Sequence, residues 1–438
     1  MTTGSQKTSS EGLVRGIRKW DLVAVTINSI IGAGIFGLPS KVYSLIGSYS
    51  LIAFVVCALV VMLIILCFAE VGSRFEQTGG PYLYAQEAFG PAVAFEVGWL
   101  IWLARLTAFA ANCNLMVNYL SFFWTPSNTG VTRAIIIMGV VLALTCLNLL
   151  GVRQAAIASN IFTIGKLVPM LIFIAAGLFF LNPSAYALGA RPSTGAFSQS
   201  VLLLLYAFTG FEMAAIPAGE IRDPQKHLPR ALLIAMAVIA GTYILIQVVC
   251  IGTLPDLANS TKPLADAGRQ FMGTAGGAII SAGAIISVAG NLNITVLSAS
   301  RVPFAIAEQK QLPSLFAHVH KRFFTPDVSI VITTVLMLML TLTSSFVAAL
   351  TISTIARLVA YAVTCAALPV LRKRVDAPKA LFHLPGGPVI AIAALLLSAW
   401  LLANSTLKEG IQSVIAAAIG LAIYLGYQFG VRGQNRER

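Results

Sequence analysis

The chain has 438 residues, of which 58% are hydrophobic and 10% are charged, and its formal net charge is +13. Soluble globular domains carry about 25% charged residues, so the composition excludes that class and predicts an all-helical, polytopic protein of the lipid bilayer. In such a protein the basic residues reflect loop bias across the membrane. We therefore expect no nucleic-acid partner.

Twelve apolar runs of about 20 residues alternate with polar breaks, which predicts twelve transmembrane helices. We expect these spans at 20–46, 50–74, 91–120, 132–150, 155–181, 198–219, 229–254, 275–307, 326–346, 350–371, 388–403 and 410–430. The chain then divides into a tail at 1–16, a five-helix repeat at 17–181, a second repeat at 198–372, two further helices within 386–430 and a tail at 431–438.

Lysine and arginine are unevenly distributed between the two sides of these spans. Of 29 such residues, 20 fall on the side that holds both termini, six on the other side and three inside spans. Cytoplasmic loops carry the excess of these residues. We therefore expect a multi-pass protein of the plasma (inner) membrane with both termini in the cytoplasm.

The first predicted span contains three glycines within six residues, Gly32, Gly34 and Gly37. In hydrocarbon, a helix break leaves costly unpaired backbone groups, so it is tolerated only where it lines a cavity or meets a ligand. A half-helix that begins there points free N–H groups at an anion such as a carboxylate. The alternative is that these glycines only allow another helix to pack closely.

The sixth predicted span is interrupted by Thr209, Gly210 and Glu212. A mid-span glutamate is expensive and indicates function, unless it is protonated and hydrogen-bonded to a neighbouring helix. Two interrupted helices that lie five spans apart are typical of an inverted repeat with a substrate site at the bilayer midplane. Apart from these breaks, the two halves look unalike in sequence.

Lys166 lies well inside the fifth predicted span. A charged amine at that depth is costly, so we expect it to exchange a proton during a working cycle. The alternative is a fixed cation that bonds to carbonyl groups of the first helix break. Ser287, in the eighth span, is a candidate partner for it.

Two arginines, Arg105 and Arg357, also lie inside predicted spans. Intramembrane arginine usually faces the protein interior and needs a partner, for which Glu70, Glu96 and Glu212 are the candidates. We interpret both arginines as structural partners and do not infer an acidic substrate from them. Five asparagines either line a cavity or form interhelical hydrogen bonds: Asn112, Asn114, Asn118, Asn291 and Asn293.

The remaining features are expected to be structural. The six cysteines lie in apolar runs without CxxC spacing, so we interpret them as small buried hydrophobic residues. Residues 82–89 are predicted to form a short amphipathic helix after a Gly-Gly-Pro turn, and residues 256–272 a long external loop. No nucleotide-binding or nucleophile motif stands out, so we expect no cofactor, no metal and no enzymatic activity.

Five stretches stand in order along the chain: GAGIF at 32–36, TGGPY at 78–82, GFE at 210–212, EIRDPQKHLP at 220–229 and SRVPFAIAEQKQLP at 300–313. Together they resemble the amino acid–polyamine–organocation (APC) permeases over nearly the whole chain. The resemblance implies the leucine-transporter fold, a 5+5 inverted repeat with helices 1 and 6 unwound around a bound amino acid. It also implies that the α-carboxylate and α-ammonium groups meet Ile31, Gly32, Ala33, Gly34, Ile35, Phe208, Thr209, Gly210 and Phe211.

In APC proteins that resemble this chain, a lysine in helix 5 takes the place of a sodium ion, so Lys166 argues against sodium coupling. We expect proton symport of a small-molecule amino acid by alternating access, with Lys166 and Glu212 as proton-coupling residues. The resemblance implies that helices 1, 2, 6 and 7 move against helices 3, 4, 8 and 9. The alternatives are an amino acid or amine exchanger on the same fold and a non-transporting sensor. Neither the amino acid carried nor the oligomeric state follows from the sequence.

Overall fold

The computed structural model of the chain describes residues 17–77, 79–150, 166–216, 218, 221–323, 325–405 and 407–434. The α-helices are α1 (Lys19–Ile30), α2 (Ala33–Ile46), α3 (Ser50–Gly72), α4 (Pro81–Phe89), α5 (Pro91–Leu120), α6 (Gly130–Leu149), α8 (Thr194–Phe208), α9 (Glu212–Ala215), α10 (Pro224–Thr253), α11 (Pro263–Ala299), α12 (Arg301–Glu308), α13 (Asp327–Thr343), α14 (Phe346–Lys373), α15 (Gly387–Ala403) and α16 (Leu407–Gln434). The 3-10 helices are η1 (Gly47–Tyr49), η2 (Thr125–Asn128), η3 (Leu178–Phe180), η4 (Pro183–Tyr186), η6 (Leu257–Asn259) and η7 (Ser314–Ala317). The described part of the fifth predicted span, Lys166–Phe180, is also helical.

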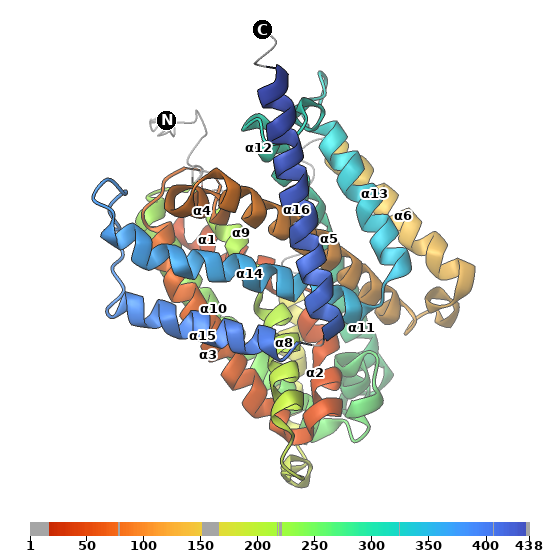
Figure 1. Cartoon of the computed structure of the whole chain (residues 1–438). Helices are drawn as coiled ribbons and strands as arrows, with labels where there is room; N and C mark the ends of the chain where they lie inside the picture. Colours follow the sequence, from red (N-terminus) through yellow and green to blue (C-terminus); the bar gives the residue numbers. More distant parts are fainter. Residues whose placement is uncertain are drawn as a thin grey trace, which may run out of the picture.

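The described chain is helical, as the composition predicts. Eight of its helical segments are long and apolar enough to cross a membrane, and three shorter apolar helices accompany them. α5 lies inside the bundle and packs against α14, α11, α4, α13 and α16 (Figure 1). α6 and α16 are covered least by the rest of the protein, which suits helices that face lipid.

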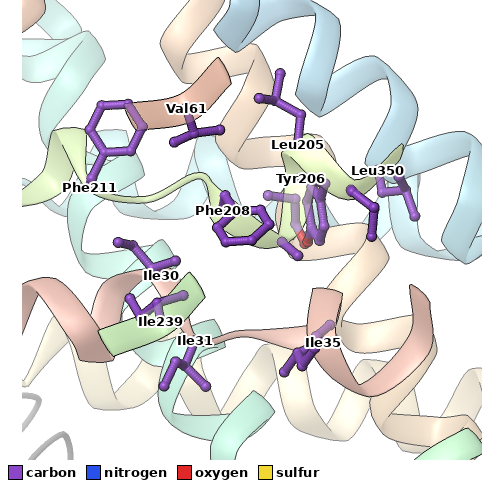
Figure 2. Packing of buried hydrophobic residues seen from close by; sticks show 14 of the residues in the cluster. Ile30, Ile31, Ile35, Val61, Leu205, Tyr206, Phe208, Phe211, Ile239 and Leu350 are labelled. Atoms are coloured by element: carbon purple, nitrogen blue, oxygen red, sulfur yellow. The ribbon is translucent and has the colours of Figure 1, made fainter. Parts of the chain in front are cut away.

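Both predicted helix breaks are present. α1 ends at Ile30 and α2 begins at Ala33, and α8 ends at Phe208 before α9 begins at Glu212. α2 packs against α8, and α1 packs against α9. Figure 2 shows the two extended segments close to each other, one between Ile31 and Ile35 and the other between Phe208 and Phe211. The two breaks therefore meet inside the protein.

A second contact joins the outer ends of the same two broken helices. Ile17, just before α1, forms an isolated parallel bridge with Ile221, which follows α9. The N–H of Arg222 donates to the Ile17 carbonyl oxygen at 2.9 Å. The start of the first span is thereby attached to the end of the sixth.

Glu70, a candidate partner for the intramembrane arginines, instead joins three segments at the end of α3. Arg372 of α14 donates to its carboxylate from Nε at 2.7 Å and from Nη2 at 2.6 Å. The N–H of Leu384 donates to the same carboxylate at 2.9 Å, and Nη2 of Arg74 lies 3.5 Å from it. This bidentate pair, with Glu70 buried and Arg372 partly exposed, connects α3, α14 and the segment that leads into α15.

The short helix predicted at 82–89 is confirmed as α4. Gly80, with φ of +55°, turns the chain, and Pro81 occupies the first helical position, which its ring favours. α4 and α12 lie at the end of the molecule toward which the C-terminal end of α16 runs, and η4 lies at the opposite end (Figure 1). The sidedness of these ends remains a prediction.

The predicted external loop at 256–272 is wrong in its second half. α11 begins at Pro263 and continues until Gly273, where a φ of +68° kinks it. Polar residues such as Asp266 and Arg269 lower the hydropathy of this first part, and a hydropathy count therefore stops short of it.

All six cysteines are free, and five of them are buried. The prediction that all six are buried is wrong for Cys146, which is exposed near the end of α6. An apolar run identifies a helix in the membrane, but it does not say which side of that helix faces the protein.

Candidate functional site

The two helix breaks border one cavity. Its empty volume is about 440 Å³, a figure that includes space open to solvent. Its walls come from both half-helices of each broken span and from α5, α11 and α14. The lining residues are Ser29, Ile30, Gly32, Ala33, Gly34, Arg105, Ala108, Asn112, Tyr206, Thr209, Gly210, Met213, Asn291, Ile294, Thr295 and Arg357.

The first turn of α2 supplies backbone N–H groups at this cavity. Amides of a first helical turn have no acceptor within their own helix, and that of Ala33 donates to Oδ1 of Asn112 at 2.9 Å. Nδ2 of Asn112 donates in turn to Oδ1 of Asn291 at 2.9 Å. This pair joins α5 to α11 across the start of α2. The other first-turn amides of α2 are those of Gly34 and Ile35.

The glycines of the first break fill both of the roles considered for them. A Cβ on Gly34 would lie 2.6 Å from Cα of Ala207 in α8, and one on Gly37 would lie 2.8 Å from the ring of Phe346. These two glycines therefore allow close helix packing. A Cβ on Gly32 would instead meet the Asn291 side chain at 3.1 Å, so Gly32 leaves room at the break itself.

Gly210 holds the second break against the first. Its φ is +118°, which side-chain-bearing residues rarely adopt, and an added Cβ would lie 2.3 Å from the carbonyl oxygen of Ser29 in α1. Next to it, Thr209 donates to the Tyr206 carbonyl from N–H at 3.3 Å and from Oγ1 at 2.8 Å. The last carbonyls of α8 have no donors within the helix, so this end of α8 is an acceptor-rich wall.

Glu212, at the start of α9, is buried between two arginines. Its Oε1 lies 3.8 Å from Nη2 of Arg105 and 3.7 Å from Nε of Arg357. Its Oε2 accepts hydrogen bonds from the Tyr361 hydroxyl at 2.5 Å and from the Gly210 N–H at 2.9 Å. The prediction that both arginines have an acidic partner is confirmed, and one carboxylate serves the two of them.

The two arginines are bonded differently. Arg357 donates from Nη1 to the hydroxyl of Thr209 in the second break. Arg105 donates from Nη1 to Oγ of Ser298 at 3.1 Å, whereas its Nε and Nη2 have no hydrogen-bond partner in the part of the chain that the structure describes.

Lys166 lies behind the first break and is fully buried. Its Nζ donates to the carbonyl oxygens of Asn28 and Ile31, both at 3.0 Å. These carbonyls belong to the C-terminal end of α1, where the helix dipole favours a cation. Ser287, the predicted further partner, has a hydroxyl without a hydrogen bond among the described residues.

The predicted substrate contacts fall into two groups. Five of the nine line the cavity: Gly32, Ala33, Gly34, Thr209 and Gly210. The side chains of the other four, Ile31, Ile35, Phe208 and Phe211, pack in the buried hydrophobic cluster around the breaks (Figure 2). These four apolar side chains therefore hold the interrupted segments in place.

Several lining residues were not predicted as substrate contacts from the sequence, although cavity lining was one of the two roles left open for Asn112 and Asn291. Arg105, Ala108 and Asn112 follow one another on one face of α5, and Asn291 and Thr295 are one turn apart on α11. Spacings of three and four residues put side chains on one helix face. That signal groups the residues, but it does not say that their face meets the two breaks.

The sequence profile of the amino acid permeases matches residues 17–426 of the chain. The chain belongs to this family. The permease is therefore an integral, multi-pass membrane protein of the APC superfamily and an amino acid transporter, as the five sequence motifs predict.

Relatives of the permease match it over almost its full length. The serine/threonine exchanger SteT of Bacillus subtilis is 31% identical over 96% of the permease and 98% of SteT. The methylthioribose transporter of the same organism is 26% identical, over 98% of the permease and 96% of that protein. The branched-chain amino acid permease BcaP is 27% identical, over 96% and 94% of the two chains.

Proposed function

We propose that the permease carries an α-amino acid across the plasma membrane by alternating access and holds it between the two helix breaks. The observation that carries this proposal is that two interrupted helices border one cavity with opposite half-helix ends. The N-terminus of α2 suits an α-carboxylate, and the C-terminal carbonyls of α8 suit an α-ammonium group. Together they would recognise the zwitterion that all α-amino acids share.

In this arrangement the binding segments are residues 31–35 and 208–211, and they act mainly through their backbone. Oδ1 of Asn112 accepts the hydrogen bond from the Ala33 N–H. The N–H groups of Gly34 and Ile35 are then left for the substrate carboxylate. The apolar side chains of the two segments keep these groups in position.

We also propose twelve spans, two five-helix repeats at 17–181 and 198–372, and cytoplasmic termini. The packing of α1 against α9 and of α2 against α8 supports the repeat. The repeat relates α1 to α8 and α2 to α9, so these two contacts are equivalent to each other. Attachment of a bulky water-soluble maleimide to single cysteines introduced into loops, in intact cells, would test the sidedness.

For the coupling ion, we propose a proton carried by Lys166. Its amine donates to two carbonyl oxygens, and no ion pair joins it to a carboxylate among the described residues. A neutral amine has two N–H groups for these two acceptors, and the ammonium form has three, so both forms fit the site. Glu212, the other residue predicted to couple protons, has two arginines as counter-ions, and in this scheme it serves instead as a fixed charge.

Exchange is the second candidate, and two observations favour it. SteT is named a serine/threonine exchanger, and the end of α1 also suits a cation that keeps its proton throughout the cycle. Lys166 would then stabilise the break, and one amino acid leaving would permit another to enter.

Uptake of radiolabelled amino acids into proteoliposomes separates these candidates. A proton symporter accumulates one class of amino acid under an inward proton gradient, whereas an exchanger needs vesicles preloaded with amino acid. Lys166→Gln keeps two N–H donors but carries no proton. We expect it to lose gradient-driven accumulation and to retain exchange, whereas Lys166→Ala leaves both carbonyls unpaired and impairs both.

Two results would count against the proposal. Accumulation driven by the gradient in the Lys166→Gln protein would contradict proton transfer by Lys166. Binding without flux in empty and preloaded vesicles would contradict transport and favour a sensor.

A further inference from the structure

The cavity between the helix breaks is more basic than recognition of a zwitterion requires. Among the described residues that line it, the charged ones are Arg105 and Arg357, and no carboxylate joins them on its wall. We propose that the permease selects amino acids whose side chain is a carboxylate, so that dicarboxylic amino acids are its substrate class. This inference rests on the proposed function and deepens it.

Among the described residues, the charges beside the cavity do not balance without a further anion. Arg105 and Arg357 are 3% and 7% exposed, and Glu212 is the carboxylate paired with both of them. One positive charge is left over, and a buried charge is costly unless it is paired. The zwitterion itself is neutral, so binding its two α-groups leaves the surplus in place. A side-chain carboxylate on the substrate would remove it.

Arg105 has hydrogen-bond donors available for such a carboxylate. Its Nε and Nη2 are buried and have no hydrogen-bond partner among the described residues. The nearest acid oxygen, Oε1 of Glu212, is 3.8 Å from Nη2, so Glu212 attracts the guanidinium without accepting from it. Two guanidinium N–H groups form a fork that matches a carboxylate in geometry and charge.

Arg357 has a different part in this arrangement. Its Nη1 donates a hydrogen bond to the Thr209 hydroxyl. The Glu212 carboxylate accepts hydrogen bonds at the second break from the Tyr361 hydroxyl and the Gly210 N–H. Arg357 and Glu212 therefore belong to the structure of the break. Arg105 comes from α5, outside both breaks, lines the cavity and keeps two guanidinium donors without a hydrogen-bond partner among the described residues.

Pairs of substrates with nearly the same shape test this inference on the wild-type protein. L-Glutamate and L-glutamine differ in one side-chain charge, as do L-aspartate and L-asparagine. In proteoliposomes we expect at least one acid to be transported about tenfold better than its amide, because a site built for a polar group rejects the analogue that lacks it. Equal or better transport of both amides overturns the inference and leaves the proposed function standing. Transport of no amino acid in a full panel overturns both.

A substitution of Arg105 tests whether this residue causes the preference for acids over amides. Arg105→Gln should lower the acid-over-amide transport ratio at least about tenfold. Arg191→Gln, which removes a charge from an exposed loop position, is the matched control and should keep the wild-type ratio. An unchanged ratio in Arg105→Gln overturns the role of Arg105. If that variant does not reach the membrane, the wild-type comparison of acid and amide decides alone.

Discussion

Replacing Gly210 by alanine is expected to force the two helix breaks apart. The residue has φ of +118°, and its missing Cβ leaves room for the carbonyl group of Ser29 in α1. In Gly210→Ala the new carbon would lie 2.3 Å from the Ser29 oxygen and 2.9 Å from the Ser29 carbonyl carbon. Both are backbone atoms, so neither can rotate out of the way.

The size of the effect follows from these two constraints. A residue held at an unfavourable φ costs about 1–3 kcal/mol, and the close contact adds to that cost. If the strain falls on the state in which the breaks touch, a free energy of 1–3 kcal/mol disfavours that state by about 5–150-fold. We therefore expect uptake by Gly210→Ala to be lower than wild-type uptake by about 5–150-fold or more.

The assay is radiolabelled uptake in proteoliposomes, together with the apparent melting temperature of the purified protein in detergent. Gly241→Ala is the matched control, because nothing lies within 4 Å of a Cβ added to that glycine in α10. Alanine there favours the helix by up to about 1 kcal/mol, so stability should hold or rise. Wild-type uptake and melting in Gly210→Ala would refute the contact between the two breaks.

Three further predictions concern other parts of the molecule. Glu70→Gln leaves Arg372 without its bidentate carboxylate partner, and we expect the free energy of unfolding to fall by about 3 kcal/mol. A lower melting temperature would show this loss, whereas an unchanged melting temperature would mean that the pair adds no stability. Asn112→Ala removes the hydrogen bonds that hold the start of α2 to α5 and α11, and it should weaken amino acid binding in a scintillation proximity assay without lowering the melting temperature by more than a few degrees. In folded, detergent-purified protein, Cys146 should react with maleimide well before the five buried cysteines, and equal rates for all six would contradict its exposure.

The two helix breaks could be predicted from the sequence because each has a local cause. Gly32 and Gly210 lie within apolar spans, where an unpaired backbone is too costly to occur without a reason. Lys166 and Glu212 stood out on the same grounds, since a charge in hydrocarbon needs compensation. In each case the residue and its neighbours in the chain were enough.

The partners of these residues could not be predicted, because they depend on how distant helices rotate against one another. Arg105, Glu212 and Arg357 come from three separate helices, and the sequence does not say that one carboxylate lies between two guanidinium groups. The bond from the Ala33 amide to Asn112 depends likewise on which face α5 turns to α2. Local periodicity groups residues on one helix, whereas tertiary packing decides which groups meet.

The attachment of α1 to α9 has a consequence for the transport cycle. The two half-helices meet at the breaks, where Gly210 lies against Ser29, and again at their outer ends, where Ile17 pairs with Ile221. Because they contact each other at both ends, neither half-helix is free to tilt alone. We expect the two, which come from distant parts of the sequence, to move as one rigid body. A chemical cross-link within the pair should leave turnover intact, whereas one from the pair to α5 should arrest the protein with its cavity open to one side.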